Sequence, residues 1–284
     1  MLIDTHTHLG RLRVADPGLA PDELIARMDD LGIDVAVVLA VEMPEELDYF
    51  VPTGQVLSWC AQYPDHLIPF CAVDPRHRYP GHFDPYPILR EYRACGCRGF
   101  GENLTGLPVD DPMQRRVYEA CARLHLPIVM HFDSYINRDG PGLPAFERLL
   151  SDYPELVFIA HGPHFWREIS ADVDVLAPNY PTGLVVPGGR VEELLTLYPN
   201  CMADLSAHSA YNALARDREH AVGFLERQRE KLLFGTDLLA KTQEIAIAPL
   251  FRELPLTSGA RDAIGWSNAS RLLGLEAQEV GNAR

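Results

Sequence analysis

Short apolar runs recur along the chain and are separated by segments with helical periodicity. Each run is almost continuously apolar, which is typical of strands that are covered on both faces of a parallel sheet. The eight runs are residues 2–5, 34–41, 67–73, 97–101, 126–131, 156–160, 201–205 and 232–236. Helical patterns between them predict helices over residues 113–124, 21–32, 55–63, 143–151, 190–198, 218–231 and 243–253.

This alternation predicts an α/β fold made of parallel βαβ units. Because there are eight strands, we expect them to close into a (β/α)8 TIM barrel, with residues 1–284 forming a single domain. A chain of 284 residues with 47% apolar residues is long enough to bury the core of one such barrel. A doubly wound open sheet is the alternative, but the glycine-rich phosphate turn that usually follows its first strand is absent from the sequence.

Two long segments interrupt the alternation, residues 74–87 after the third strand and residues 161–189 after the sixth. Both begin where a strand should end, and in a barrel that end is the catalytic face. Loops this long are uncommon in compact domains unless they have a function. We therefore expect residues 161–189 to line a pocket, whereas a surface role explains residues 74–87 almost equally well.

Charge and composition narrow the range of partners. The formal net charge of −15 argues against nucleic acids and anionic membranes, both of which attract clustered Lys and Arg. No apolar run approaches the roughly 18 residues of a membrane-spanning helix, and the N-terminus has no signal-peptide pattern. The six scattered cysteines are interpreted as buried free thiols. We expect a cytoplasmic protein that acts on a small-molecule substrate, and a homo-oligomer is compatible with this picture.

The first candidate chemistry lies at His6-Thr7-His8, where the first strand ends. Side chains at positions i and i+2 of a strand point to the same face, so both imidazoles can reach one ion. Imidazole nitrogen is a favoured ligand for zinc. A lone His-x-His motif is weak, however, since a pair of polar residues at a strand end explains it equally well. We expect this pair at the rim of the barrel rather than in its core.

Four more polar residues follow the fourth, fifth, sixth and eighth predicted strands. Each of them alone has a structural explanation, for example an Asp that caps the next helix. Six potential nitrogen and oxygen ligands at the same end of a barrel instead predict a metal site. A set without thiolates fits a catalytic divalent ion, first zinc and then manganese or iron. The candidate metal ligands are His6, His8, Glu102, His131, His161 and Asp237.

These motifs resemble those of the amidohydrolase superfamily. Within it they are most similar to the branch that contains aminocarboxymuconate-semialdehyde decarboxylase and related small hydrolases. The resemblance covers nearly the whole chain and implies the same barrel. It also implies a single ion held by His6, His8, His131 and Asp237, with His161 assisting at the water. It rests on His6-Thr7-His8, His131, His161, the sequence FGTD at 234–237 and the closing residues 268–275.

The fourth strand departs from many relatives with two ions, which bridge their metals with a carboxylated lysine. The only lysines are Lys231 and Lys241, far from that strand, so this arrangement is excluded. Glu102 occupies the position instead and resembles the bridging Glu of TatD-like nucleases. One ion or two therefore remain possible, and we favour direct contact of Glu102 with metal, because an unpaired buried carboxylate is costly.

A catalytic metal lowers the pKa of its bound water from 15.7 to about 7, which provides hydroxide at neutral pH. Asp237 is the candidate catalytic residue that takes the proton of the water and passes it to the leaving group. His161 is the second candidate and would orient the nucleophile or stabilise the developing oxyanion. His164, Trp166 and Arg167 follow closely and either bind substrate or pack a lid.

Three classes of enzyme fit these residues. The first is a hydrolase of a small-molecule amide, lactone or ester. The second is a non-oxidative decarboxylase of a cyclic or unsaturated carboxylic acid, which needs a cationic anchor such as Arg76, Arg78 or Arg167. The third is a phosphodiesterase or nuclease, against which the negative net charge argues. A metal-binding protein without catalysis fits least well, because the six ligands surround an open barrel mouth.

Overall fold

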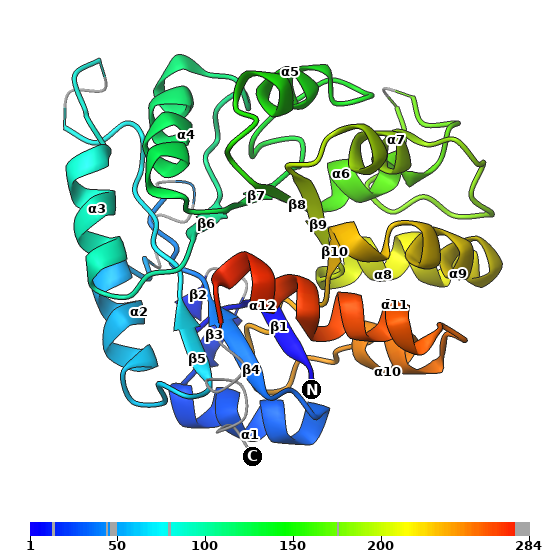
Figure 1. The fold of residues 1–284 in the computed structure, drawn as a ribbon, viewed down its shortest axis with the longest axis horizontal. Coiled ribbons are helices and arrows are strands. Elements are labelled where there is room, and N and C mark those ends of the chain that lie inside the picture. Colours follow the sequence, from blue (N-terminus) through cyan, green and yellow to red (C-terminus); the bar gives the residue numbers. More distant parts are fainter. Residues whose placement is uncertain (13–14, 44, 46–49, 79–80, 175, 276–284) are drawn as a thin grey trace.

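Eight parallel strands form a closed ring with helices outside it in the computed structural model (Figure 1). The structure describes residues 1–12, 15–43, 45, 50–78, 81–174 and 176–275. One ladder runs β1-β4-β5 and the other runs β6-β7-β8-β9-β10, with each pair parallel. The strands are β1 Ile3–Thr7, β4 Val35–Val38, β5 Leu67–Pro69, β6 Phe100–Asn103, β7 Ile128–His131, β8 Phe158–His161, β9 Cys201–Asp204 and β10 Leu232–Leu233.

Backbone hydrogen bonds close the ring at the two gaps between these ladders. Between β5 and β6, the Cys71 N–H donates to the Gly99 carbonyl at 3.0 Å. Between β10 and β1, the Thr5 N–H donates to the Phe234 carbonyl at 2.9 Å, and the His8 N–H donates to the Leu238 carbonyl at 2.9 Å. The strands therefore follow one another around the ring in chain order, which confirms the predicted (β/α)8 barrel and excludes the open sheet.

Two strands begin and end later than predicted, because polar residues that follow the apolar run continue each of them. The first strand was expected over residues 2–5 but continues through Thr7, and the fourth reaches Asn103 rather than residue 101. The side chains of His6, Thr7 and Asn103 are buried although they are polar, and Asn103 donates a hydrogen bond to the Gln114 side chain at 2.8 Å. An apolar pattern alone therefore ends these two strands too early.

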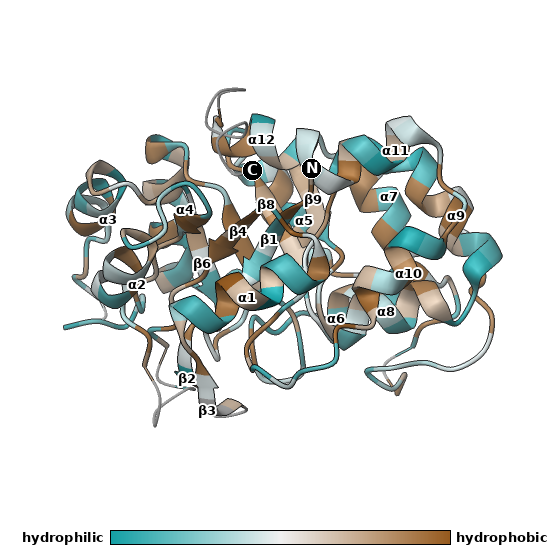
Figure 2. Ribbon diagram, turned by 90° about the horizontal axis from the view of Figure 1, so that it is seen from below, coloured by the Kyte–Doolittle hydropathy of each residue, from teal (hydrophilic) through white to brown (hydrophobic). Residues whose placement is uncertain are grey.

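The nearly continuous apolar character of the strands reflects two separate cores. Alternate side chains, such as Val35 and Val37 of β4, fill the interior of the barrel together with Ile3, Val129 and Ile159. The intervening positions pack outward against the helices in a second, larger cluster. Figure 2 shows β4 as hydrophobic, whereas the helices carry both hydrophobic and hydrophilic residues.

Seven helices match the predicted segments. They are α1 Pro21–Leu31, α2 Thr53–Cys60, α4 Pro112–Leu124, α5 Pro144–Asp152, α7 Arg190–Leu197, α9 Arg218–Arg227 and α10 Ile247–Glu253. The best-patterned of them, α4, also has clear ends: the Asp111 side chain accepts from the Met113 N–H at 2.8 Å, and His125 ends the helix with φ of 52°. The helices that the pattern did not predict are α3 Tyr86–Ala94, α6 Pro163–Trp166, α8 Ala207–Ala215, α11 Ser258–Asp262 and α12 Asn268–Leu273.

A β-hairpin of β2 Gly10–Leu12 and β3 Ala15–Leu19 was not predicted. Gly18 has φ of 84°, and a Cβ there would lie 2.1 Å from the Gly10 carbonyl oxygen, so the two strands approach closely only because Gly18 has no side chain. Figure 2 places this hairpin at the opposite end of the barrel from α12. The hairpin therefore stands at the end where the strands finish.

All six cysteines are free thiols, as expected, although Cys95 is exposed and only the other five are buried. Among the described residues no helix is long and apolar enough to cross a membrane.

The closing segment holds the last helix to the rest of the barrel through Asn268. Its amide donates to the Arg229 carbonyl at 2.7 Å and to the Leu232 carbonyl at 2.9 Å, and its side chain is 1% exposed. The same helix, α12, contributes Ala269 and Leu273 to the interior core. The conformation of β10 thus depends on the closing segment.

Replacing Asn268 by Ala should leave both carbonyls without a donor. We expect the free energy of unfolding to fall by about 1–3 kcal/mol, the usual cost of unsatisfied buried polar groups. Urea unfolding followed by circular dichroism measures the change. Arg271→Ala is the matched control, because it removes an exposed donor to the Asn268 oxygen and an exposed ion pair with Glu230, and it should cost about 0.5 kcal/mol or less. Equal stability of the two variants would contradict this role of Asn268.

Candidate metal centre

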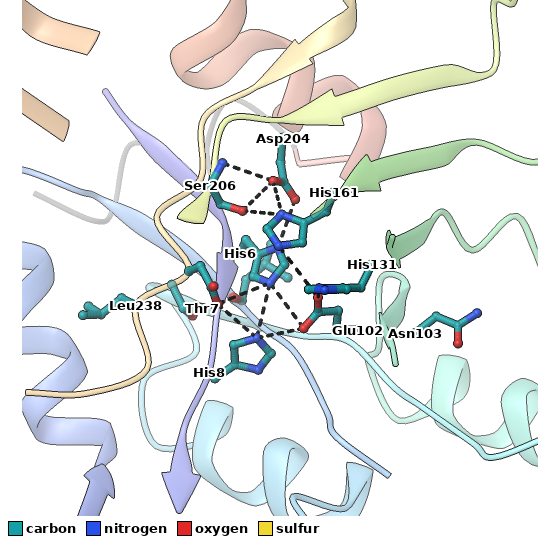
Figure 3. A network of polar contacts seen from close by, with 12 residues as sticks. His6, Thr7, His8, Glu102, Asn103, His131, His161, Asp204, Ser206 and Leu238 are labelled. Carbon is teal, nitrogen blue, oxygen red and sulfur yellow. Dashed lines mark hydrogen bonds and ion pairs between the residues drawn. The ribbon is translucent and has the colours of Figure 1, made fainter. Parts of the chain in front are cut away.

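The structure brings all six predicted ligands together at the C-terminal ends of the strands. Figure 3 shows His6, His8, Glu102, His131 and His161 facing one another. They come from β1, β6, β7 and β8 and from the segment that follows β10. His6 is 0% exposed and His8 is 3% exposed, so the pair is buried inside the barrel mouth. The pair lies at the end of β1 and faces the barrel mouth, but the expectation of a rim position outside the core is wrong, because both side chains are buried.

Four of the six side chains direct one atom each toward a common region. The Nε2 atoms of His6 and His8 lie 3.3 Å apart. The Oδ1 atom of Asp237 lies 3.7 Å from the Nε2 of His6 and 3.5 Å from that of His8. The Oε2 atom of Glu102 lies 3.6 Å and 3.3 Å from the same two nitrogens. Ligands placed tetrahedrally about 2.1 Å from one ion lie about 3.4 Å from one another, so this spacing fits a zinc-sized ion.

The other oxygen of Glu102 faces a second group. Its Oε1 atom lies 2.9 Å from the Nδ1 of His131 and 3.9 Å from the Nε2 of His161. These three side chains can direct their ligand atoms to within 4.8 Å of one another, as can His6, His8 and Glu102. Glu102 is thus shared between two groups of possible ligands.

Asp204, at the end of β9, fixes two of the imidazoles from behind. Its Oδ2 lies 2.9 Å from the Nδ1 of His6, and its Oδ1 lies 2.9 Å from the Nδ1 of His161. The Ser206 hydroxyl lies 2.8 Å from the same His161 nitrogen. With Nδ1 held by a carboxylate, each ring carries its proton there and leaves Nε2 free to face the cluster. Asp204 was not among the predicted site residues, although an acidic residue at the end of an apolar strand is the same signal that identified Glu102.

A second buried carboxylate, Asp4, connects β1 to the segment that carries Asp237. Its Oδ1 accepts hydrogen bonds from the backbone N–H groups of His6 and Thr236, both at 3.0 Å. Complete burial raises the pKa of Asp4 to about 7. The Asp237 N–H donates to the His6 carbonyl at 2.8 Å, and Asp237 has φ of 58°, a conformation that is uncommon outside glycine. These contacts aim the Asp237 carboxylate at His6 and His8.

The electrostatics of the cluster favour bound positive charge. Burial alone would lower the pKa of His6, but Asp204 and Glu102 raise it well above 6.5. Burial alone would also lower the pKa of His131, yet Asp133 and Glu102 raise this pKa to about 10. Burial would raise the pKa of Glu102, but His6 and His131 hold it well below its usual range. Without metal, protons on the imidazoles therefore compensate the carboxylates, and a divalent ion would replace them.

A cavity of about 530 Å³ opens directly onto this cluster. Its walls come from the segments after β1, β4, β6, β7 and β10. None of its lining residues belongs to 74–87 or 161–189, so the expectation that residues 161–189 line the pocket does not hold for the described part of that loop. The lining residues are His8, Leu12, Val41, Glu45, Glu102, Leu104, His131, Asp133, Tyr135, Ile136, Asp237 and Leu239.

The residues suggested for substrate binding in 161–189 serve the core instead. Trp166 is fully buried, and its indole N–H donates to the Asp204 carbonyl at 3.2 Å. Arg167 is buried and donates to the Ala177 carbonyl at 3.0 Å. The Nε2 of His164 lies 3.1 Å from the Asn179 side-chain oxygen. The segment therefore packs against the outer side of the site and supports it.

The three arginines that were suggested to hold a substrate carboxylate do not line the cavity. Arg76 uses its guanidinium on two carboxylates, at 2.8 Å from both oxygens of Glu45 and at 2.7 Å from Asp74. Arg78 is exposed and does not line the cavity. Arg167 does not line it either.

The donor set fits a divalent ion by its own chemistry. It consists of imidazoles and carboxylates without thiolates, at ligand-to-ligand spacing, and Asp204 holds the Nδ1 atoms of His6 and His161. The Nδ1 of His8 is buried without a hydrogen-bond partner among the described residues, so the polar contacts of this ring are those that its Nε2 makes within the cluster.

Comparisons with known proteins agree with this architecture. An uncharacterised TIM-barrel protein from Bordetella bronchiseptica superposes with a TM-score of 0.72 at 16% identity, covering 99% of each chain. A probable 2-pyrone-4,6-dicarboxylic acid hydrolase from Acinetobacter baumannii gives a TM-score of 0.61 at 17% identity, covering 96% of this chain and 99% of that one. A 5-carboxyvanillate decarboxylase from Novosphingobium aromaticivorans, complexed with manganese, gives 0.64 at 14% identity, covering 97% and 96%.

At these sequence identities the superpositions show only that the fold is shared. No curated protein matches the chain. The family model described as amidohydrolase, however, matches residues 3–275, nearly the whole sequence. This chain therefore belongs to the amidohydrolase family.

Proposed function

We propose that this protein is a metal-dependent hydrolase that cleaves a small-molecule amide, lactone or ester with a metal-activated water. The observation that carries the proposal is the position of Glu102, whose two carboxylate oxygens face two separate groups of ligand atoms. In this proposal His6, His8 and Asp237 would hold one ion, His131 and His161 would hold a second, and Glu102 would contribute one oxygen to each. A single ion held by His6, His8, His131 and Asp237 is less well supported, because His131 lies in the Glu102–His161 group.

Zinc is our first choice of metal because the ligand atoms around His6 and His8 have tetrahedral spacing. Manganese is the second choice, since the related 5-carboxyvanillate decarboxylase contains it. When bound, such an ion acts as a Lewis acid that lowers the pKa of a water molecule to about 7.

The protein's own residues would then move the proton and hold the substrate. Asp237 lines the cavity and uses one oxygen toward His6 and His8, so its second oxygen can accept the proton of the attacking water and deliver it to the leaving group. His161 is held by Asp204 and Ser206 and cannot swing, which suits it to a fixed position at the reacting atoms.

A non-oxidative decarboxylase is the second candidate, because a structural relative with this fold carries out that reaction. Such an enzyme must hold the carboxylate of its substrate, and Arg is the usual partner. None of the described residues that line the cavity is Arg or Lys, and Arg76 is already engaged by Glu45 and Asp74. The cavity therefore favours hydrolysis.

We also propose a cytoplasmic location, supported by six free cysteines that form no disulfide. The acidic net charge supports a small-molecule substrate rather than a nucleic acid.

The reaction can be tested with zinc-loaded protein and three uncharged compounds, an aryl ester, an aryl lactone and an anilide, in water enriched in ¹⁸O. We expect hydrolysis of at least one of them, with one ¹⁸O in the acid product by mass spectrometry, because water is the nucleophile. The double variant His6→Ala with His8→Ala should lose this activity. Carbon dioxide release from a hydroxybenzoic acid, with no hydrolysis of the three compounds, would favour the decarboxylase.

Replacing Glu102 by Gln tests the bridge. A neutral amide is a poor bridging ligand, so the metal-to-protein ratio should fall from about two towards one. Activity should fall by orders of magnitude, because the water loses a second Lewis acid. Metal content is measured by mass spectrometry on protein purified without chelator. The His6→Ala, His8→Ala double variant is the control, in which the ion held by that pair should also be lost. An unchanged ratio in Glu102→Gln would contradict a bridging role.

Replacing Asp204 by Asn tests the support behind the imidazoles. The amide keeps one acceptor but turns a donor toward the other ring, so either His6 or His161 loses its Nδ1 partner. We expect metal affinity to fall by about 10–100-fold, measured by competition with a chelator of known affinity. The exposed Asp152→Asn removes the same charge far from the site and should leave affinity unchanged. Equal affinities in the two variants would remove Asp204 from the metal centre.

A further inference from the structure

The cavity next to the metal centre carries more negative charge than the proposed ligands require. Beyond Glu102 and Asp237, two other carboxylates, Glu45 and Asp133, line it. None of its described lining residues is Lys or Arg. The rest of the lining is apolar or aromatic: Leu12, Val41, Leu104, Tyr135, Ile136 and Leu239. A substrate entering this space meets an apolar wall and, beyond the proposed metal ligands, the carboxylates of Glu45 and Asp133.

Asp133 is a rigid carboxylate at the edge of the cluster. Its Oδ1 accepts hydrogen bonds from the backbone N–H groups of Tyr135 and Ile136, both at 2.6 Å. Its Oδ2 lies 3.4 Å from the Nε2 of His131. Among the described residues, no Lys or Arg forms an ion pair with Asp133.

Glu45 is compensated only in part. It shares the single guanidinium of Arg76 with Asp74, through contacts of 2.8 Å and 2.7 Å, so this triad of side chains keeps one net negative charge. Arg76 could bind an anionic substrate only by leaving both carboxylates. The cost of leaving two charged partners exceeds what one new ion pair returns.

We infer that the substrate of this site is an uncharged or cationic ester, lactone or amide with an apolar body, and that Asp133 is the residue that selects against anions. This inference rests on the proposed hydrolase function and deepens it. Tyr135 is 76% exposed and lines the cavity with Asp133, so an aromatic ring is present at this wall for a cationic group.

The charge preference can be measured as binding, without knowledge of the natural substrate. Hydroxamic acids bind catalytic metals through the hydroxamate group, so three of them with one body serve as probes. They are benzohydroxamic acid and its 4-carboxy and 4-aminomethyl derivatives, titrated calorimetrically into zinc-loaded protein. We expect the aminomethyl probe to bind most tightly and the carboxy probe at least tenfold more weakly than it, because a single charge near Asp133 and Glu45 interacts at low dielectric.

Variants assign the preference to these side chains. Asp133→Asn should reduce the ratio of the two dissociation constants about three- to tenfold, and Glu45→Gln should reduce it as well. Asp30→Asn is the matched control: Asp30 is exposed near the C-terminal end of α1, at the opposite end of the barrel, and its loss should leave the ratio unchanged. Metal content is measured in each variant. If Asp133→Asn binds less zinc than the unmodified protein, the conclusion is drawn from Glu45→Gln alone.

The outcomes separate this inference from the function on which it rests. Tightest binding of the carboxy probe, or a ratio that neither variant changes, overturns the charge preference while the metal centre stands. Failure of all three probes to bind zinc-loaded protein overturns the metal centre, and this inference with it.

Discussion

Two buried carboxylates, Glu102 and Asp204, determine the geometry at the end of the barrel where the strands finish. A buried charge is stable only beside groups that compensate it, and here these groups are imidazoles from other strands. Asp204 on β9 holds His6 of β1 and His161 of β8, two strands that are not neighbours in the ring. Glu102 on β6 faces the same β1 from the other side. The histidines are therefore oriented by contacts across the barrel mouth, which only a closed ring allows.

Most of the fold was predictable because a strand that is buried on both faces is almost continuously apolar in sequence. Eight nearly continuous apolar runs correspond to eight strands, since alternate residues such as Val37 and Val38 enter different cores. The hairpin at 10–19 was not predictable in the same way, because its short strands contain Pro17 and Gly18 and have no apolar alternation. The short helices α6 and α12 were missed because each has too few turns for a helical period to become visible.

The six ligand candidates were predictable because each is a polar residue at or shortly after the end of an apolar run. Asp204 also lies near the end of a run but was counted as part of its strand, and Asp4 lies inside the first strand itself. The sequence carries no sign of what these two carboxylates contact, since their partners are as distant as Thr236 and His161. The sequence also does not indicate which ligands group together. Only the structure reveals that Glu102 turns one oxygen to His8 and the other to His131.

The substrate cavity shows why fold and family determine the chemistry more firmly than the substrate. The ligands stand on strands, whose positions the closed barrel fixes, whereas Leu12, Glu45, Asp133 and Tyr135 stand on the segments that follow the strands. Those segments are free to change between relatives that share only 14–17% of their residues with this chain. Asp133 illustrates the point, because its orientation comes from a local turn closed by the N–H groups of Tyr135 and Ile136. A charge held by two local hydrogen bonds can appear in one relative and be absent from another without any change in the metal centre beneath it, so substrate preference in this chain follows from its own cavity.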